Sequence, residues 1–413
     1  ALAVIQSDGS MITELAYLSD EKKIDDNDKT YSVIYLKDKV YNLLVELHTE
    51  SYKNEDVIAQ WVIVRNNEKD NITLKNIYSS FLNVRAYSYY LTHFNGVWAG
   101  EMNRVEEKLD YGIESIESKK GIRTTQSENP SFILSLDHPA QENSGICYGG
   151  ALAWSGNYKL SFQVDEWDHL NILSGINPYL SDYILEPGKS IETPKMIYTF
   201  SDSGQGQISR NFHDWSRKYA LNKGFDERPI VLNSWEGAYF DFDEKTITDM
   251  IDDAARLGVE MFVLDDGWFG NKYPRNADNA ALGDWQVNKN KLPHGIQYLI
   301  DHATKKGLKF GIWIEPEMVN PKSELAENHP EWIIQSNGRE KITWRNQLQL
   351  DLTNPQVQDF IWNMVDELLS KNKGIAYIKW DANRHVEQVG STYLPKDRPV
   401  SYTHLTLPTN REV

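Results

Sequence analysis

Four short apolar stretches in the second half of the chain each end in polar and aromatic side chains. The stretches are "IVLNSWEG", "MFVLDDGW", "FGIWIEPEM" and "YIKWDANR". Their ends carry Asn233, Trp235 and Glu236; Asp265, Asp266 and Trp268; Trp313, Glu315 and Glu317; and Lys379, Asp381 and Asn383. Carboxylates accept hydrogen bonds from hydroxyl groups, lysine donates to hydroxyl oxygens, and indole faces stack on the C–H faces of sugar rings. This mixture of side chains predicts a carbohydrate-binding site.

A metal site and a purely structural role are the competing interpretations of these strand ends. Neighbouring carboxylates bind hard cations, but no strand end supplies a histidine, and the tryptophans would crowd a hydrated cation. We therefore expect no metal and no cofactor. A single polar strand end is commonly an ion pair or a helix cap. Four in succession, each combining carboxylates with tryptophan, favour one shared site.

Strands and helices alternate around these stretches from about Arg228 onward. "DEKTITDMIDDAARLG" predicts an amphipathic helix, with Asp243 as its N-cap and Gly258 at its end. "GIQYLIDHATKKG" and "NPQVQDFIWNMVDELLSKNKG" predict two further helices. Strand–helix repetition indicates a parallel sheet, and polar residues at every strand's C-terminal end favour a (β/α)8 barrel over a doubly wound sheet. No glycine-rich phosphate loop follows any strand, which argues against a dinucleotide-binding fold.

The sequence predicts a multidomain protein, β and then α/β, in four segments. In residues 1–205, alternating apolar and polar residues between turn-forming clusters predict an N-terminal β-sandwich whose start is missing. Residues 206–227 are expected to form a helical linker. Residues 228–398 supply only four strands, so we expect the first half of a (β/α)8 TIM-type catalytic barrel. Residues 399–413 include "VSYTHLTLPT", which resembles a translated sequencing adapter, and are expected to be non-native.

The composition argues against several classes of function. The formal net charge of -17 over 413 residues repels phosphate backbones, so nucleic acid is not an expected partner. The single cysteine, Cys147, excludes disulfides within the chain and zinc clusters built on thiolates. No apolar run is long enough to span a membrane, and no signal peptide is visible. We therefore expect a cytoplasmic protein that is not associated with a membrane.

A series of motifs in the second half occurs in the order typical of one enzyme family. The motifs are "NSWEGAYFDF", "LDDGWFG", "LGDW", "KFGIWIEPEMV", "HPEW", "RNQLQLDLTNP" and "YIKWDANR". In these motifs the chain resembles the bacterial α-galactosidases of glycoside hydrolase family 36. The resemblance covers residues 228–388 strongly. It covers the β-rich half more loosely, through "LTHFNGVWAGE", "WSGNYKL" and "LEPGKSIETPKMIYTFSDSG".

The resemblance implies a retaining hydrolase that removes terminal α-linked galactose from oligosaccharides such as melibiose or raffinose by a double displacement. It implies that Asp381, in the "KWD" motif, is the catalytic nucleophile. Asp265 and Asp266 lie where the family holds the axial 4-hydroxyl and the 6-hydroxyl. The galactose-binding residues that the resemblance implies are Asp265, Asp266, Lys379, Arg345, Trp235, Trp313 and Asn383. The chemistry agrees, because a carboxylate beside Lys379 is expected to be held ionised.

The family's acid/base aspartate has no counterpart in this sequence. A retaining glycosidase needs a second carboxyl about 5–5.5 Å from the nucleophile. In the family this residue belongs to a later, glycine-rich motif that ends "RFD", which these 413 residues do not contain. We therefore expect the chain by itself to be inactive.

Three other activities stay open on the sequence alone. A galactosyl transferase of the raffinose-synthase type shares the first half-reaction but passes galactose to a sugar acceptor. An α-N-acetylgalactosaminidase also resembles this family, and a fragment without its acid/base could be a non-catalytic galactose-binding module. The expected partners are α-galactoside oligosaccharides, and the full-length protein is expected to be a homo-oligomer.

Overall fold

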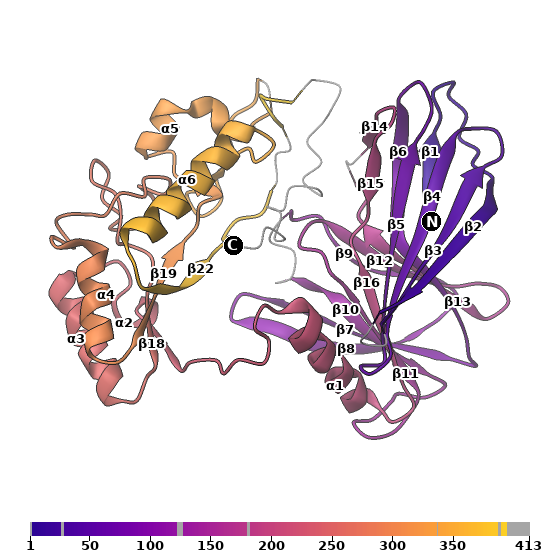
Figure 1. The fold of residues 1–413 in the computed structure, drawn as a ribbon, viewed down its shortest axis with the longest axis horizontal. Coiled ribbons are helices and arrows are strands. Elements are labelled where there is room, and N and C mark those ends of the chain that lie inside the picture. Colours follow the sequence, from indigo (N-terminus) through magenta and orange to yellow (C-terminus); the bar gives the residue numbers. More distant parts are fainter. Residues whose placement is uncertain are drawn as a thin grey trace. The chain divides into compact units, whose positions relative to one another are not determined.

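The computed structural model describes residues 2–25, 29–121, 127–179, 182–336, 338–386 and 390–394 (Figure 1). The chain divides into two compact units, residues 1–226 and residues 227–400. Strands dominate the first unit, whereas the second alternates strands with helices. The segment 399–413, predicted to be non-native, lies outside the described residues. Of the helices in the described ranges, none is long and apolar enough to cross a membrane.

The first unit contains a six-stranded and a ten-stranded antiparallel sheet. The smaller sheet has the order β1-β6-β13-β12-β9, with β14 beside β6. Its strands are β1 (Leu2–Ile5), β6 (Ile72–Arg85), β9 (Gly112–Ser118), β12 (Tyr158–Val164), β13 (His169–Ile176) and β14 (Tyr183–Leu185). The larger sheet has the order β2-β3-β4-β5-β16-β11-β10-β7-β8, with β15 beside β5. Its strands are β2 (Leu15–Ile24), β3 (Lys29–Asp38), β4 (Leu43–Tyr52), β5 (Val57–Asn66), β7 (Tyr89–Val97), β8 (Gly100–Leu109), β10 (Glu128–Leu136), β11 (Cys147–Leu152), β15 (Ser190–Glu192) and β16 (Met196–Ser201).

Apolar side chains from both sheets meet in one buried core. Leu91 and Phe132 from the ten-stranded sheet belong to the same cluster as Leu160 and Phe162 from the six-stranded sheet. The rings of Phe132 and Phe162 meet edge to face, with centroids 4.9 Å apart. The two sheets therefore pack as a sandwich, which confirms the predicted N-terminal fold.

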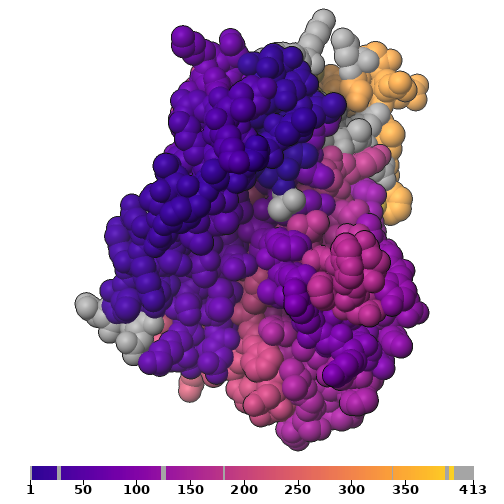
Figure 2. Space-filling view, turned by 90° about the vertical axis from the view of Figure 1, so that its right-hand side faces the viewer, coloured from indigo at the N-terminus to yellow at the C-terminus, as the bar shows by residue number. Residues whose placement is uncertain are grey.

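The edge strand β2 is largely exposed and carries the charged run "SDEKK". It contributes to the indigo surface in Figure 2. An exposed edge offers unpaired backbone groups to other chains, and charged side chains on it oppose edge-to-edge pairing.

The segment predicted to be a linker begins with a helix that packs on the first unit. This helix, α1 (Gln205–Trp215), continues into the π-helical turn η1 (Ser216–Ala220). Ile208 is buried with Ala140 and Cys147, and Phe212 packs against the same cluster. The helix therefore lies within the first unit, which extends to Asp226.

The second unit is built on four parallel strands in the order of the chain. These are β17 (Val231–Asn233), β18 (Met261–Leu264), β19 (Lys309–Ile314) and β22 (Ile375–Trp380), and each pairs with the next. Its helices are α2 (Trp235–Ala238), α3 (Glu244–Arg256), α4 (Gly295–Lys305), α5 (Glu324–Asn328), η2 (Pro330–Trp332) and α6 (Pro355–Lys371). The short strands β20 (Met318–Val319) and β21 (Leu348–Gln349) pair antiparallel as a separate two-stranded sheet.

Local sequence signals account for the helix α3. The side chain of Asp243 accepts a hydrogen bond from the backbone N–H of Thr246 at 2.8 Å, so it is the N-cap that the sequence predicted. Ile247, Ile251 and Ala254 form the buried stripe of the helix. Gly258 follows the helix at a φ of 79°, a conformation that glycine adopts without strain.

The four strands differ in burial in the way an incomplete barrel requires. All four residues of β18 are buried, and so are five of the six residues of β19. Val231 in β17 and Tyr377 in β22 are each 48% exposed, because these strands form the two edges of the described sheet. The α/β prediction is confirmed, with four of the eight strands of a closed barrel present in the described residues.

Replacing Gly150 with alanine should destabilise the sandwich. Gly150 lies opposite Phe132, and an added Cβ would lie 2.3 Å from that ring and 2.8 Å from the side chain of Met196. Overpacking of this kind costs about 1–3 kcal/mol, which urea unfolding followed by circular dichroism can measure. Gly100→Ala is the matched control, because the nearest atom to its added Cβ is 3.5 Å away. Equal stability of the two variants would contradict the packing described here.

Candidate active site

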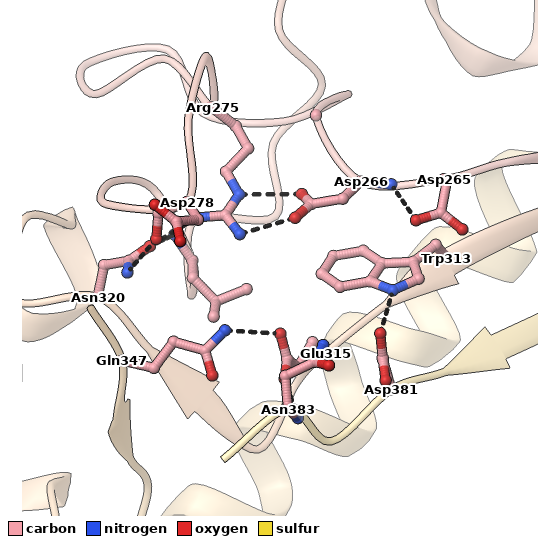
Figure 3. A network of polar contacts seen from close by, with 12 residues as sticks. Asp265, Asp266, Arg275, Asp278, Trp313, Glu315, Asn320, Gln347, Asp381 and Asn383 are labelled. Carbon is pink, nitrogen blue, oxygen red and sulfur yellow. Dashed lines mark hydrogen bonds and ion pairs between the residues drawn. The ribbon is translucent and has the colours of Figure 1, made fainter. Parts of the chain in front are cut away.

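Parallel pairing brings the C-terminal ends of the four strands to one edge of the sheet. Asn233 pairs with Val263, and Trp313 pairs with Lys379, so the residues that follow each strand are neighbours in space. Figure 3 shows Asp265, Asp266, Trp313, Glu315 and Asp381 converging from these ends. Side chains from the ends of all four strands therefore meet at this edge, whereas Glu236 is exposed and accepts a hydrogen bond from Tyr239.

Asp265 follows β18 and is held by groups from two other strands, the neighbouring β17 and, beyond β19, β22. The Asn233 amide donates to its Oδ2 at 2.6 Å, and the Lys379 ammonium donates to the same oxygen at 2.8 Å. Asp265 is 3% exposed. The sequence led us to expect Lys379 beside Asp381, but its ammonium pairs with Asp265 instead. Alternation along a strand places Lys379 and Asp381 on one face, but it does not determine whether the Lys379 ammonium reaches Asp265 or Asp381.

Asp266 forms a buried bidentate ion pair with Arg275. The guanidinium Nε donates to one carboxylate oxygen at 2.9 Å and Nη2 to the other at 2.7 Å. Burial pushes the pKa of Asp266 above its usual range, and the charge of Arg275 opposes that shift. Lys291 stands nearby and donates to the carbonyls of Phe240, Gly267 and Arg275. Burial lowers the pKa of Lys291 to about 8.

Asp381 is fixed at the end of β22 by neutral donors. Its backbone N–H continues the pairing with β19 by donating to the carbonyl of Ile314. The indole Nε1 of Trp313 donates to Oδ2 at 2.9 Å, and the N–H of Ala382 donates to Oδ1 at 2.9 Å. Trp313 is itself locked, because it is 2% exposed and its carbonyl accepts from the indole of Trp268 at 3.0 Å. Both carboxylate oxygens of Asp381 are thus held in fixed positions. Among the described residues, no lysine or arginine forms an ion pair with them.

Two buried glutamates, Glu315 and Glu317, follow the end of β19. Glu315 accepts from the N–H of Asn383 at 2.5 Å and from the Gln347 amide at 2.9 Å. Burial, together with the negative charge of Asp381, raises the pKa of Glu315 to about 7. Burial also raises the pKa of Glu317 to about 7, against the opposing hydrogen bond from the Trp380 indole. Both glutamates therefore carry a proton over much of the range below neutral pH.

The remaining predicted residues lie around this centre in different ways. Trp235 begins α2, is half-buried, and packs edge-on against Tyr239 and Phe240 with centroids 5.2 Å and 5.0 Å apart. Asn383 joins the network through its bond to Glu315. Arg345 lies at the tip of a tight turn and is exposed. Among the described residues, no hydrogen bond or ion pair joins its side chain to the other predicted residues.

Sequence reasoning missed Arg275 and Gln347 as members of the site. Arg275 lies in an irregular loop, where neither helical nor strand periodicity indicates burial. The only available signal was indirect, because two adjacent buried aspartates require a cationic or protonated partner. Gln347 lies in the "RNQLQLDLTNP" motif, but nothing in that motif distinguishes a glutamine that contacts Glu315 from one that does not.

The sandwich followed by parallel strand–helix units, with carboxylates and tryptophans at the strand ends, is the architecture of a carbohydrate-active protein. Residues 190–408, more than half of the chain, match the melibiase family. Residues 1–186 match the N-terminal domain of glycosyl hydrolase family 36. The chain therefore belongs to the melibiase family and carries the N-terminal domain of family 36.

Curated relatives and solved structures agree with this assignment. The chain is 36% identical over 382 residues to alpha-galactosidase 1 of Pediococcus pentosaceus, covering 92% of this chain and 51% of that protein. It is 36% identical over 373 residues to alpha-galactosidase AgaA of Geobacillus stearothermophilus, covering 90% of this chain and 50% of the relative. The crystal structure of AgaA superposes with a TM-score of 0.93 at 34% identity, over 98% of this chain and 58% of that chain. The chain thus spans about half the length of the curated relatives it matches.

Replacing Glu317 with glutamine should flatten the pH dependence of stability. The folded-state pKa of about 7 lies above the ordinary value of 4.5, so the folded state holds a proton that the unfolded state releases first. Unfolding therefore becomes easier as pH rises from about 4.5 to 7, by about 3 kcal/mol for this group. In urea unfolding, the free energy of unfolding should therefore change less between pH 5 and pH 8 in the variant than in the unsubstituted chain.

Glu367→Gln, on the exposed side of α6, is the matched control and should retain the pH dependence of the unsubstituted chain. A Glu317→Gln variant whose stability fell with pH as steeply as the control would contradict a neutral Glu317.

Proposed function

We propose that the whole protein is a retaining α-galactosidase that hydrolyses terminal α-linked galactose, with Asp381 as its nucleophile. The observation that carries this proposal is the setting of Asp381, whose two carboxylate oxygens are fixed by Trp313 and Ala382 without a cationic partner in the described part of the chain. A nucleophile needs this combination of fixed aim and undiminished charge. The names of the curated relatives support the same activity.

In the first half-reaction, one oxygen of Asp381 attacks the anomeric carbon of the galactoside. The bond from that carbon to the leaving oxygen breaks, and a second carboxyl protonates the leaving group. In the second half-reaction, water attacks the galactosyl–Asp381 ester, gives its proton to the same second group, and restores the carboxylate. The anomeric configuration is retained because the carbon is inverted twice.

The strand-end residues around Asp381 are proposed to hold the sugar ring. Asp265 and Asp266 present carboxylate oxygens to galactose hydroxyls, while Lys379 and Arg275 hold those carboxylates in place. Trp235 supplies an aromatic wall. The remaining proposed ligands are Trp313, Asn383 and Arg345.

Neither of the buried glutamates Glu315 and Glu317 fits the acid/base role. Glu315 is fully buried, and both of its oxygens accept hydrogen bonds from Asn383 and Gln347. Glu317 is bound by the Trp380 indole on β22. The acid/base is therefore proposed to belong to the glycine-rich motif that the family resemblance implies and that these 413 residues do not contain. On this proposal the chain alone lacks the group that protonates an ordinary leaving oxygen.

The proposed substrates are α-galactosides of the raffinose series. Structures of the Geobacillus stearothermophilus relative have been determined in complex with stachyose and with raffinose. The chain is 33% identical to that protein over 98% of its own length. The transferase, α-N-acetylgalactosaminidase and binding-module alternatives have no observation of their own in their favour. The cytoplasmic location and the homo-oligomeric state stay predictions.

A mechanism-based inactivator should label Asp381. A 5-fluoro-α-galactosyl fluoride carries its own leaving group, so labelling requires the nucleophile but little acid assistance. We expect one sugar adduct on the peptide that contains Asp381, found by mass spectrometry. Asp381→Asn should slow labelling by at least about 1,000-fold, whereas Asp366→Asn, on the exposed side of α6, should not change it. An adduct on another carboxylate would refute the assignment of the nucleophile.

Asp265→Ala should reduce the preference for galactosides over glucosides. A site that bonds an axial hydroxyl leaves buried acceptors unpaired when that hydroxyl is equatorial, and such mismatches discriminate strongly. We expect the ratio of kcat/KM for aryl α-galactosides to that for aryl α-glucosides to fall at least about 100-fold in the whole protein. Both substrates are measured on the same preparation, so the ratio does not depend on the fraction of the protein that is folded. Asp301→Ala, on α4, should leave it unchanged, and an unchanged ratio in Asp265→Ala would remove Asp265 from the binding site.

A further inference from the structure

The turn that carries Arg345 has an unfavourable backbone for its sequence. Trp344 and Gln347 exchange two backbone hydrogen bonds, at 3.2 Å and 3.0 Å, and so close a two-residue turn. Both central residues have positive φ, 52° at Arg345 and 58° at Asn346. Such a turn favours Asn-Gly, because side chains at positive φ are strained, least of all for Asn. An arginine at the first position therefore has to be held there by its surroundings.

The side chain of Asn320, which follows β20, holds this turn through hydrogen bonds. Its Nδ2 donates to the carbonyl of Asn346 at 2.7 Å and to the carbonyl of Asp278 at 3.0 Å. The side chain of Asn346 in turn donates to Asp278 Oδ1 at 3.1 Å. Asn320 is 0% exposed, so water does not compete for these bonds.

The same side chain also holds the partner of Asp266. Asn320 Oδ1 accepts from Arg275 Nη1 at 2.9 Å and from the N–H of Leu282 at 2.9 Å. Its two donors and two acceptor positions are thus all used, which is the full capacity of an asparagine amide. Figure 3 shows Asn320 beside Arg275, which faces Asp266 on its other side.

We propose that Asn320 is a positioning residue that sets the Arg345 turn and the Arg275–Asp266 pair in fixed relation to each other, so that both sides of the galactose pocket are preorganised together. This inference rests on the proposed function, in which Arg345 and Asp266 bind the sugar. Asn320 itself is proposed to contact neither the sugar nor Asp381. The N–H groups of its amide hold the Arg345 turn, and the oxygen of its amide holds Arg275.

Asn320→Asp separates the two connections. An aspartate keeps the acceptor for Arg275 and Leu282 but has no hydrogen to donate to Asn346 or Asp278. The Arg345 turn should loosen while the Arg275–Asp266 pair stays held. Adding Asn346→Gly should restore the turn, because glycine adopts positive φ without strain. A merely destabilised fold would not be restored by a second substitution in the turn.

Amide hydrogen exchange in the 413-residue chain tests the structural part without any sugar. The reporter is the N–H of Gln347, which is bonded across the turn to the carbonyl of Trp344. We expect it to exchange at least about 10-fold faster in Asn320→Asp and to slow again in the double variant with Asn346→Gly. Asn290→Asp, at an exposed position, is the control and should exchange like the unsubstituted chain. Unchanged exchange at Gln347 in Asn320→Asp would overturn the inference.

A double-mutant cycle on the whole protein tests the link to the sugar, with D-galactose as the calorimetric ligand. If Asn320 acts through Arg345, Asn320→Asp weakens binding at least about 10-fold alone but adds little in an Arg345→Ala background. If Arg345→Ala weakens binding and Asn320→Asp weakens it equally in both backgrounds, Asn320 does not act through Arg345 and the inference fails. If Arg345→Ala leaves galactose affinity unchanged, the proposed binding role of Arg345 fails, and the inference falls with it.

Discussion

The structure of the site depends on how several carboxyl groups are packed together without mutual repulsion. Asp265 and Asp266 are adjacent in the chain and almost fully buried. Each is matched by a cation, Lys379 for the first and Arg275 for the second. Removing one partner of such a buried pair leaves an uncompensated charge, which typically costs about 3–5 kcal/mol. The irregular loop that contains Arg275 is therefore tied to the strand ends by electrostatics, without a ladder of backbone bonds.

Glu315 avoids the same repulsion by a different route. It lies near Asp381 without a cationic partner in the described part of the chain, and its raised pKa keeps a proton on it below neutral pH. A neutral Glu315 still accepts the backbone N–H of Asn383 and so fixes the segment that follows Asp381. Below neutral pH, Glu315 thus serves as a protonated anchor that adds no negative charge beside Asp381.

The sequence predicted the regular elements well because their signals are local. The cap at Asp243, the buried stripe of α3 and the four apolar strands follow from residue types at fixed spacings. The polar strand ends were found for the same reason. The partner of Lys379 was not predictable, because alternation places Lys379 and Asp381 on one face but does not say which aspartate the ammonium reaches. Arg275 and Asn320 were missed because irregular loops carry no periodicity. The strand order of the ten-stranded sheet carries no local signal, because it depends on pairings between segments far apart in the chain.

Asp381 differs from Asp265 and Asp266 because, among the described residues, only neutral N–H groups hold its side chain. A lysine or arginine in direct contact would stabilise the carboxylate but would also withdraw the charge with which it attacks. The Trp313 indole and the Ala382 amide orient both oxygens and leave the negative charge in place. Lys379 and Arg275 are already engaged elsewhere, by Asp265 and Asp266. The ion pairs that hold the neighbouring aspartates thus also keep positive charge from pairing directly with Asp381, which connects the packing of the site with the reactivity proposed for it.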